Sequence, residues 1–74
     1  MWHNNRTIVQ TYTHSSSQFA WANIDDGVGW KRIKTGAPDG VNNLFVIMNV
    51  AKANGRKVNV NIDDQGFITT AYLL

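Results

Sequence analysis

Residues 39–74 have the sequence DGVNNLFVIMNVAKANGRKVNVNIDDQGFITTAYLL, in which the apolar spacing changes from helical to alternating at Asn54-Gly55. The spacing before this point predicts one helix. Asp39 is the expected N-cap, and Gly55 supplies the left-handed residue expected just past the last turn. The main apolar stripe of the expected helix consists of Val41, Leu44, Phe45, Met48 and Ala51.

A strand, a turn and a second strand are expected after the helix. Val58, Val60 and Ile62 share one face of the first strand, with polar residues between them. Residues 63–66, DDQG, predict the turn, and residues 67–74 predict the last strand. This last strand has apolar residues on both faces and ends in two leucines, so we expect the C-terminus to be paired and buried.

Three strands are expected before the helix. Alternation in residues 6–14, RTIVQTYTH, predicts the first strand, with Ile8, Gln10 and Tyr12 on one face. A polar loop follows, and residues 19–24 and 30–34 form a hairpin around the sequence DDGVG. The N-terminal end around His3 is expected to fray.

The order is therefore three strands, one helix and two strands. This order is typical of the OB arrangement, a small five-stranded barrel. We expect a mainly β protein with its helix between strands 3 and 4, forming a single domain over residues 1–74.

Composition limits what so small a domain can do. The 74 residues are 43% hydrophobic and include no Cys, so the core is marginal and neither a disulfide nor a cysteine zinc site can support it. Seven basic residues against five aspartates give a net charge of +2, which is too mild by itself to indicate a nucleic acid or membrane partner. No apolar run approaches the ~20 residues of a membrane span, so we expect no membrane insertion.

The helix is apolar beyond its main stripe. Val46, Ile47 and Val50 lie off that stripe, and one small core can hardly cover both sides of a helix. We therefore expect self-association through these three residues and the C-terminal Leu74.

The sequence gives little support for catalysis. Its two histidines are His3, near the expected frayed end, and His14, at the edge of the polar loop. Both aspartate pairs, 25–26 and 63–64, fall in turns, where Asp bonds to its own backbone. We expect no enzyme, no cofactor and no metal site.

Two ligand classes suit an OB barrel. Aromatic and basic side chains on the expected hairpin suggest stacking of single-stranded nucleic acid bases with phosphate contacts; they are Trp21, Trp30, Lys31, Arg32 and Lys34. Neutral hydrogen-bonding side chains around residues 12–18, together with nine asparagines along the chain, favour a glycan-binding surface instead.

Residues 42–74 resemble the C-terminal half of small pentameric toxin B subunits, the OB-fold delivery subunits of the pertussis-like and subtilase-cytotoxin-like kind and their secreted relatives. The shared pattern is an apolar helix ending in Ala-x-x-x-Gly/Asn, a Val-x-Val strand, a turn and an Ile-Thr-x-x-Tyr-Leu strand. The opening of the chain is similar to the first strand of that family, more loosely. The matching positions are Ala51, Gly55, Val58, Val60, Ile68, Thr69, Tyr72 and Leu73.

This resemblance implies a ring of five subunits whose helices line the centre, and binding of cell-surface glycans, often sialylated. It also implies a catalytic partner subunit and secretion. In such subunits a Tyr and a Ser of the first strand and its loop contact the sugar beside a basic residue. The chain departs from the family in lacking a disulfide and in having His14 two positions after Tyr12, where the family has Ser. The positions that correspond to these contacts here are Tyr12, Ser15 and Ser16, with Lys31 as the basic residue, and Ser17 of the same polar loop is expected as a further glycan contact.

The leading hypothesis is a non-catalytic, lectin-like subunit of a homo-oligomer, expected to be a pentamer. The alternatives are a single-stranded nucleic-acid-binding OB domain and a purely structural oligomerisation module. Because MWHNNR is no leader peptide, we expect either a secreted mature chain with a starting Met in place of its leader, or a cytoplasmic protein.

Overall fold

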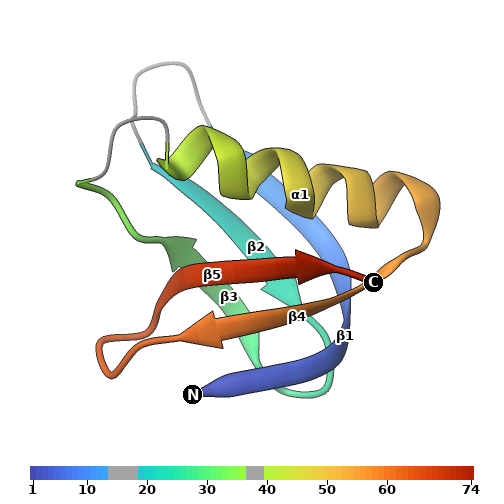
Figure 1. The fold of residues 1–74 in the computed structure, drawn as a ribbon, viewed down its shortest axis with the longest axis horizontal. Helices are drawn as coiled ribbons and strands as arrows, with labels where there is room; N and C mark the ends of the chain where they lie inside the picture. The colour runs from blue at the N-terminus through green and yellow to red at the C-terminus, as the bar shows by residue number, and fades with distance from the viewer. Residues whose placement is uncertain (14–18, 37–39) are drawn as a thin grey trace.

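The computed structural model describes residues 1–13, 19–36 and 40–74. These residues form a closed barrel with the strand order β1-β2-β3-β5-β4, and one helix lies across it (Figure 1). The β3–β5 pairing is parallel and the other pairings are antiparallel. The predicted OB-like barrel, with its helix between strands 3 and 4, is confirmed. The elements are β1 (Trp2–Thr13), β2 (Ala20–Ile24), β3 (Gly29–Ile33), α1 (Gly40–Asn54), β4 (Lys57–Ile62) and β5 (Phe67–Leu73).

Strand β1 is long enough to belong to both sides of the barrel. Its first half pairs with β4 and its second half pairs with β2. Trp2 is the Cα partner of Asn61, so the expectation of a frayed N-terminal segment is wrong. Pairing with β4 orders this segment, and sequence periodicity carries no signal for such a distant partner.

A bulge changes the alternation within β1. Ile8 pairs with Ile24 whereas Gln10 pairs with Asn23, so Val9 is an extra residue on β1. Ile8 is buried, but Gln10 and Val9 are both exposed. The prediction that Ile8 and Gln10 share a face is therefore wrong, because one inserted residue moves the following side chains to the other face.

A second bulge has the same effect in β5. Ile68 pairs with Ile62 and Thr70 pairs with Asn61, which leaves Thr69 as the extra residue. Ile68 and Ala71 consequently both contact the core, although strict alternation would separate them. The end of β5 is paired, since Leu74 N donates to Lys57 O at 2.9 Å. It is not buried, and that part of the prediction is wrong.

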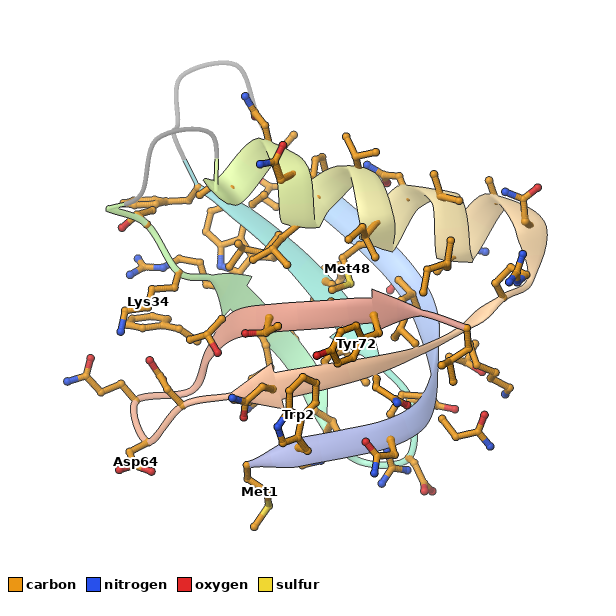
Figure 2. The ribbon with its side chains drawn as sticks, in the orientation of Figure 1. Met1, Trp2, Lys34, Met48, Asp64 and Tyr72 are labelled. Atoms are coloured by element: carbon orange, nitrogen blue, oxygen red, sulfur yellow. The ribbon has the colours of Figure 1, made fainter. Side chains whose placement is uncertain are left out.

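Helix α1 covers one end of the barrel and contacts all five strands. Met48 and Ala51 are buried in the core, and Figure 2 shows Met48 between the helix and the strands. The predicted stop is confirmed: Gly55 has a φ of +64°, and Arg56 N donates to Ala51 O as in a Schellman cap. The predicted N-cap, Asp39, lies outside the described residues. Within the described ranges, no helix is both long and apolar enough to cross a membrane.

Met48→Ala should lower the free energy of unfolding by about 2–5 kcal/mol, because Met48 is fully buried where the helix meets the barrel. Denaturant unfolding measures this loss. Asn42→Ala, at an exposed position of the same helix, should change stability by no more than about 0.5 kcal/mol. Equal effects of the two substitutions would contradict this packing of the helix.

Asp63 fixes the β4–β5 turn through its carboxylate. Its Oδ1 accepts hydrogen bonds from the backbone N–H of Phe67 at 2.9 Å and of Gln65 at 3.0 Å, and its Oδ2 accepts one from Lys34 Nζ at 3.2 Å. The Phe67 N–H has the largest effect on the pKa of Asp63. Together with Lys34 and the Gln65 N–H it lowers that pKa below the ordinary value, against an opposing effect of burial.

The stabilisation from ionised Asp63 should be fully present above the ordinary pKa of Asp and be lost as the pH falls through the lowered pKa. Asp63→Asn keeps an oxygen acceptor but removes the charge, so it should flatten the acid side of the stability–pH curve. Denaturant midpoints measured across that acid range test this. The matched control is Asp64→Asn at the exposed neighbouring position, which should leave the curve unchanged in shape.

Candidate functional site

A row of four side chains crosses the outer face of β1, β2, β3 and β5. Strand pairing places Tyr12 opposite Trp21, Trp21 opposite Arg32, and Arg32 opposite Phe67. Directly paired residues share one face of a sheet. Because Ala22, the next residue of β2 after Trp21, is fully buried, the row lies on the outside of the barrel.

Three aromatic residues line a shallow groove on this face. Tyr12, Trp21 and Trp30 enclose about 330 Å³, at the small end of the range for ligand sites. The ring centroids of Tyr12 and Trp21 are 5.2 Å apart, with the planes tilted by 51°. Tyr12 is 50% exposed and Trp30 is 47% exposed. The groove therefore presents flat apolar surface to a ligand.

Arg32 lies beside the groove between two aromatic rings. Its guanidinium carbon is 4.3 Å from the Phe19 ring centroid and 4.5 Å from that of Phe67. Such cation–π contacts restrict the side chain and are worth about 0.5–2 kcal/mol each. Arg32 Nε is buried and none of the described residues accepts a hydrogen bond from it, so the rings and not hydrogen bonds from Nε hold the guanidinium in place.

The other basic residues of the hairpin do not join Arg32. Lys31 pairs with the buried Ala22, which places Lys31 on the opposite face of β3 from Arg32. Lys34 forms an ion pair with Asp63 in the β4–β5 turn. A continuous basic track along the groove is therefore not formed by Lys31, Arg32 and Lys34.

The structure separates some of the glycan contacts predicted from the sequence. Tyr12 lies in the groove. Ser15, Ser16 and Ser17 lie outside the described residues. By strand register, Lys31 is on the other face of the sheet from Tyr12.

Sequence reasoning did not assign Trp21 and Trp30 to a sugar site and placed them in the nucleic-acid alternative. The signal that could have joined them to Tyr12 is the hairpin register around residues 25–28. That register puts Trp21 and Trp30 on the outer face, in pairs of the β2–β3 ladder that are two positions apart. Alternation along the strand already separates Arg32 from Lys31, and the register decides that Arg32 is the one on the face of Trp21.

Three of the four aspartates in the pairs 25–26 and 63–64 have structural partners. Asp63 bonds to its own turn, as predicted, whereas Asp25 Oδ1 accepts from the N–H of Thr7 on β1 at 3.0 Å. Asp26 pairs with Arg6. His3 lies within the paired part of β1 opposite Val60, and His14 lies outside the described residues. Among the described residues, no three His, Asp or Glu side chains gather as metal ligands would.

The positions predicted for subunit contact differ in exposure. Val46 is 59% exposed, and Val50 and Leu74 are also exposed. Ile47 instead packs against the core, so its expected position off the core-facing stripe is wrong. Ile47 is three residues after Leu44 and four residues before Ala51, so its side chain points to nearly the same side of the helix as theirs and lies at the edge of that stripe.

No protein-family model, curated protein or solved structure matches this chain.

Proposed function

We propose that this protein is a non-catalytic glycan-binding subunit of a homo-oligomeric ring of the toxin-B-subunit type, in which five copies present their binding sites to a cell surface. The groove of Tyr12, Trp21 and Trp30 is the observation that carries the proposal. Its aromatic lining suits the apolar face of a sugar ring, while the tyrosine hydroxyl and indole N–H suit sugar hydroxyls. Ser15, Ser16 and Ser17, which follow Tyr12 in the chain, are proposed as further contacts.

The charges beside the groove favour a glycan over single-stranded nucleic acid. A nucleic-acid groove follows several phosphates with several cations. Here Arg32 lies in the row beside the groove, while Lys31 is on the other face and Lys34 is paired with Asp63. One cation held between two rings suits contact with a single polar or acidic group of a saccharide, and it takes the place proposed for Lys31.

Trp30→Ala should weaken saccharide binding at least tenfold, or about 1.4 kcal/mol, because it removes one exposed wall of the groove. A glycan array identifies the saccharide, and calorimetry with the protein at high concentration measures its affinity. The matched control is Val9→Ala, which shortens an exposed apolar side chain on a different strand, β1, outside the groove. This variant should bind as the unaltered protein does.

Salt dependence separates the glycan proposal from the nucleic-acid alternative. Phosphate contacts release counterions, so binding of a single-stranded oligonucleotide falls steeply with added salt. We expect saccharide binding to change little. Strong, salt-sensitive oligonucleotide binding with no saccharide binding would overturn the proposal.

The outer face of α1 supports self-association. Val46 and Val50 are four residues apart and therefore lie on one face of the helix. Asn43 and Ala53, at helical spacing on either side of them, are also exposed. This strip, Asn43, Val46, Val50 and Ala53, is uncharged and carries small or medium side chains, which allows helices to pack closely. Low affinity at each groove would be raised by the valency of the ring.

Val46→Asp should lower the mass in solution to that of a single chain while the far-UV spectrum stays unchanged, because Val46 faces away from the core. Light scattering measures the mass. Val9→Asp, which adds the same charge at an exposed position of β1, should leave the assembly intact. Ile47→Asp should instead unfold the chain, since Ile47 packs against the core. An unaltered protein that scatters as a monomer would refute the ring.

A further inference from the structure

A second pair of exposed aromatic rings lies on the other side of the barrel. Trp2 of β1 and Tyr72 of β5 stack with their ring centroids 5.4 Å apart and their planes 7° from parallel. Figure 2 shows the two side chains next to each other on the β1–β4–β5 side. Trp2 is 43% exposed and Tyr72 is 58% exposed. The groove described above faces outward from β1, β2 and β3, so the two aromatic sets occupy different faces.

Two asparagines of β4, the strand that pairs with both β1 and β5, lie beside the stacked rings. Asn61 is the Cα partner of Trp2, and Asn59 is the Cα partner of Tyr72. Asn59 Oδ1 accepts a hydrogen bond from the backbone N–H of Asn5 at 2.8 Å, which fixes the orientation of that amide. Its Nδ2 then remains a donor for a ligand, and no described residue accepts from it. The surface formed by Trp2, Asn59, Asn61 and Tyr72 is called the Trp2–Tyr72 platform below.

The charge and size of the platform limit its occupant. Its four side chains are uncharged, and the two cations near them are already hydrogen-bonded within the protein. The Met1 α-ammonium donates to Asn61 Oδ1 at 2.9 Å and to Ile62 O at 2.6 Å, and Lys57, at the start of β4, donates to Thr7 Oγ1 at 2.6 Å. Two half-exposed aromatic rings offer on the order of 200 Å², well below the ~800 Å² that each partner contributes to a stable protein interface. Aromatic faces with neutral amide donors at their edge, on an area of this size, match a small neutral ligand with hydroxyl groups.

We propose that the Trp2–Tyr72 platform is a second saccharide-binding site, which holds the apolar face of a neutral sugar ring against Trp2 or Tyr72 and its hydroxyls against Asn59 and Asn61. The platform is proposed to bind the same class of ligand as the groove of the proposed function, but the two sites have no residue in common. Trp2 and Tyr12 are ten residues apart on β1, at most about 33 Å along the strand. Because the two sites face different sides, they bind independently, and each chain is bivalent.

The three tryptophans allow the two sites to be followed separately in one titration. Each indole N–H gives its own signal in a nitrogen–proton correlation spectrum of the labelled protein, and Trp2→Phe and Trp30→Phe assign two of the three. The probes are a panel of neutral oligosaccharides of galactose, glucose, mannose and N-acetylhexosamines, and separately a short oligothymidylate. We expect at least one neutral oligosaccharide to shift the Trp2 signal saturably.

Variants connect that shift to the platform. Tyr72→Ala should weaken the binding reported by Trp2 at least tenfold, whereas Tyr72→Phe, which keeps the ring, should retain most of it. Tyr12→Ala, the same truncation in the groove, should leave the Trp2 titration unchanged. Asn59 and Asn61 keep their roles only if Asn61→Ala also weakens the binding that Trp2 reports.

The outcomes for the two sites are distinguishable. A shift of Trp30 without a shift of Trp2 overturns the second site and leaves the groove, and the reverse overturns the groove and leaves the second site. A Trp2 signal that responds only to oligothymidylate identifies a base-stacking surface and overturns the saccharide proposal. A Trp2 signal that moves on dilution of the protein alone, with a fall in mass in Trp2→Ala, identifies a contact with a second copy and also overturns it.

Discussion

Closure of the barrel by β1 is the constraint on which the rest of this structure depends. A chain of 74 residues without disulfides buries too little surface to tolerate open sheet edges. Strand β1 solves this by pairing with β4 through its first half and with β2 through its second half, with bulges that bend it between the two. The apolar interior formed in this way is completed by α1, whose Met48 and Ala51 cover one end.

The same closure creates the two aromatic surfaces. Because β1 belongs to both sides of the barrel, Tyr12 near its end contributes to the groove and Trp2 at its beginning contributes to the Trp2–Tyr72 platform. Strand β5 is also shared, since Phe67 lies beside the groove and Tyr72 lies in the platform. The inward residues of these strands stabilise the fold, which leaves the outward residues available for binding.

Local chemistry made much of the fold predictable from sequence. The glycine stop at Gly55, the alternation of Val58, Val60 and Ile62, and the turn at Asp63 depend on neighbours in the chain, and the structure confirms each. The bulges at Val9 and Thr69 depend on how each strand pairs with its partner, so no pattern in the neighbouring residues predicts them. Of the three groove residues, Tyr12 was predicted from the sequence as a glycan contact. The sequence did not predict which of Lys31 and Arg32 lies on the groove face, because a shift of one residue in the hairpin register exchanges their faces.

The β3–β5 contact has a consequence for how the molecule moves. It is a short parallel seam of two residue pairs, Arg32 with Phe67 and Ile33 with Ile68, whereas the antiparallel ladders elsewhere in the barrel are longer. Transient separation of strands therefore costs the least free energy at this seam. The rings of Phe19 and of Phe67 on β5 both contact the guanidinium of Arg32 on β3, and these contacts hold the two strands together at this point. A ligand that strengthens these contacts would slow the transient opening of the whole barrel, although it binds at one point on the surface.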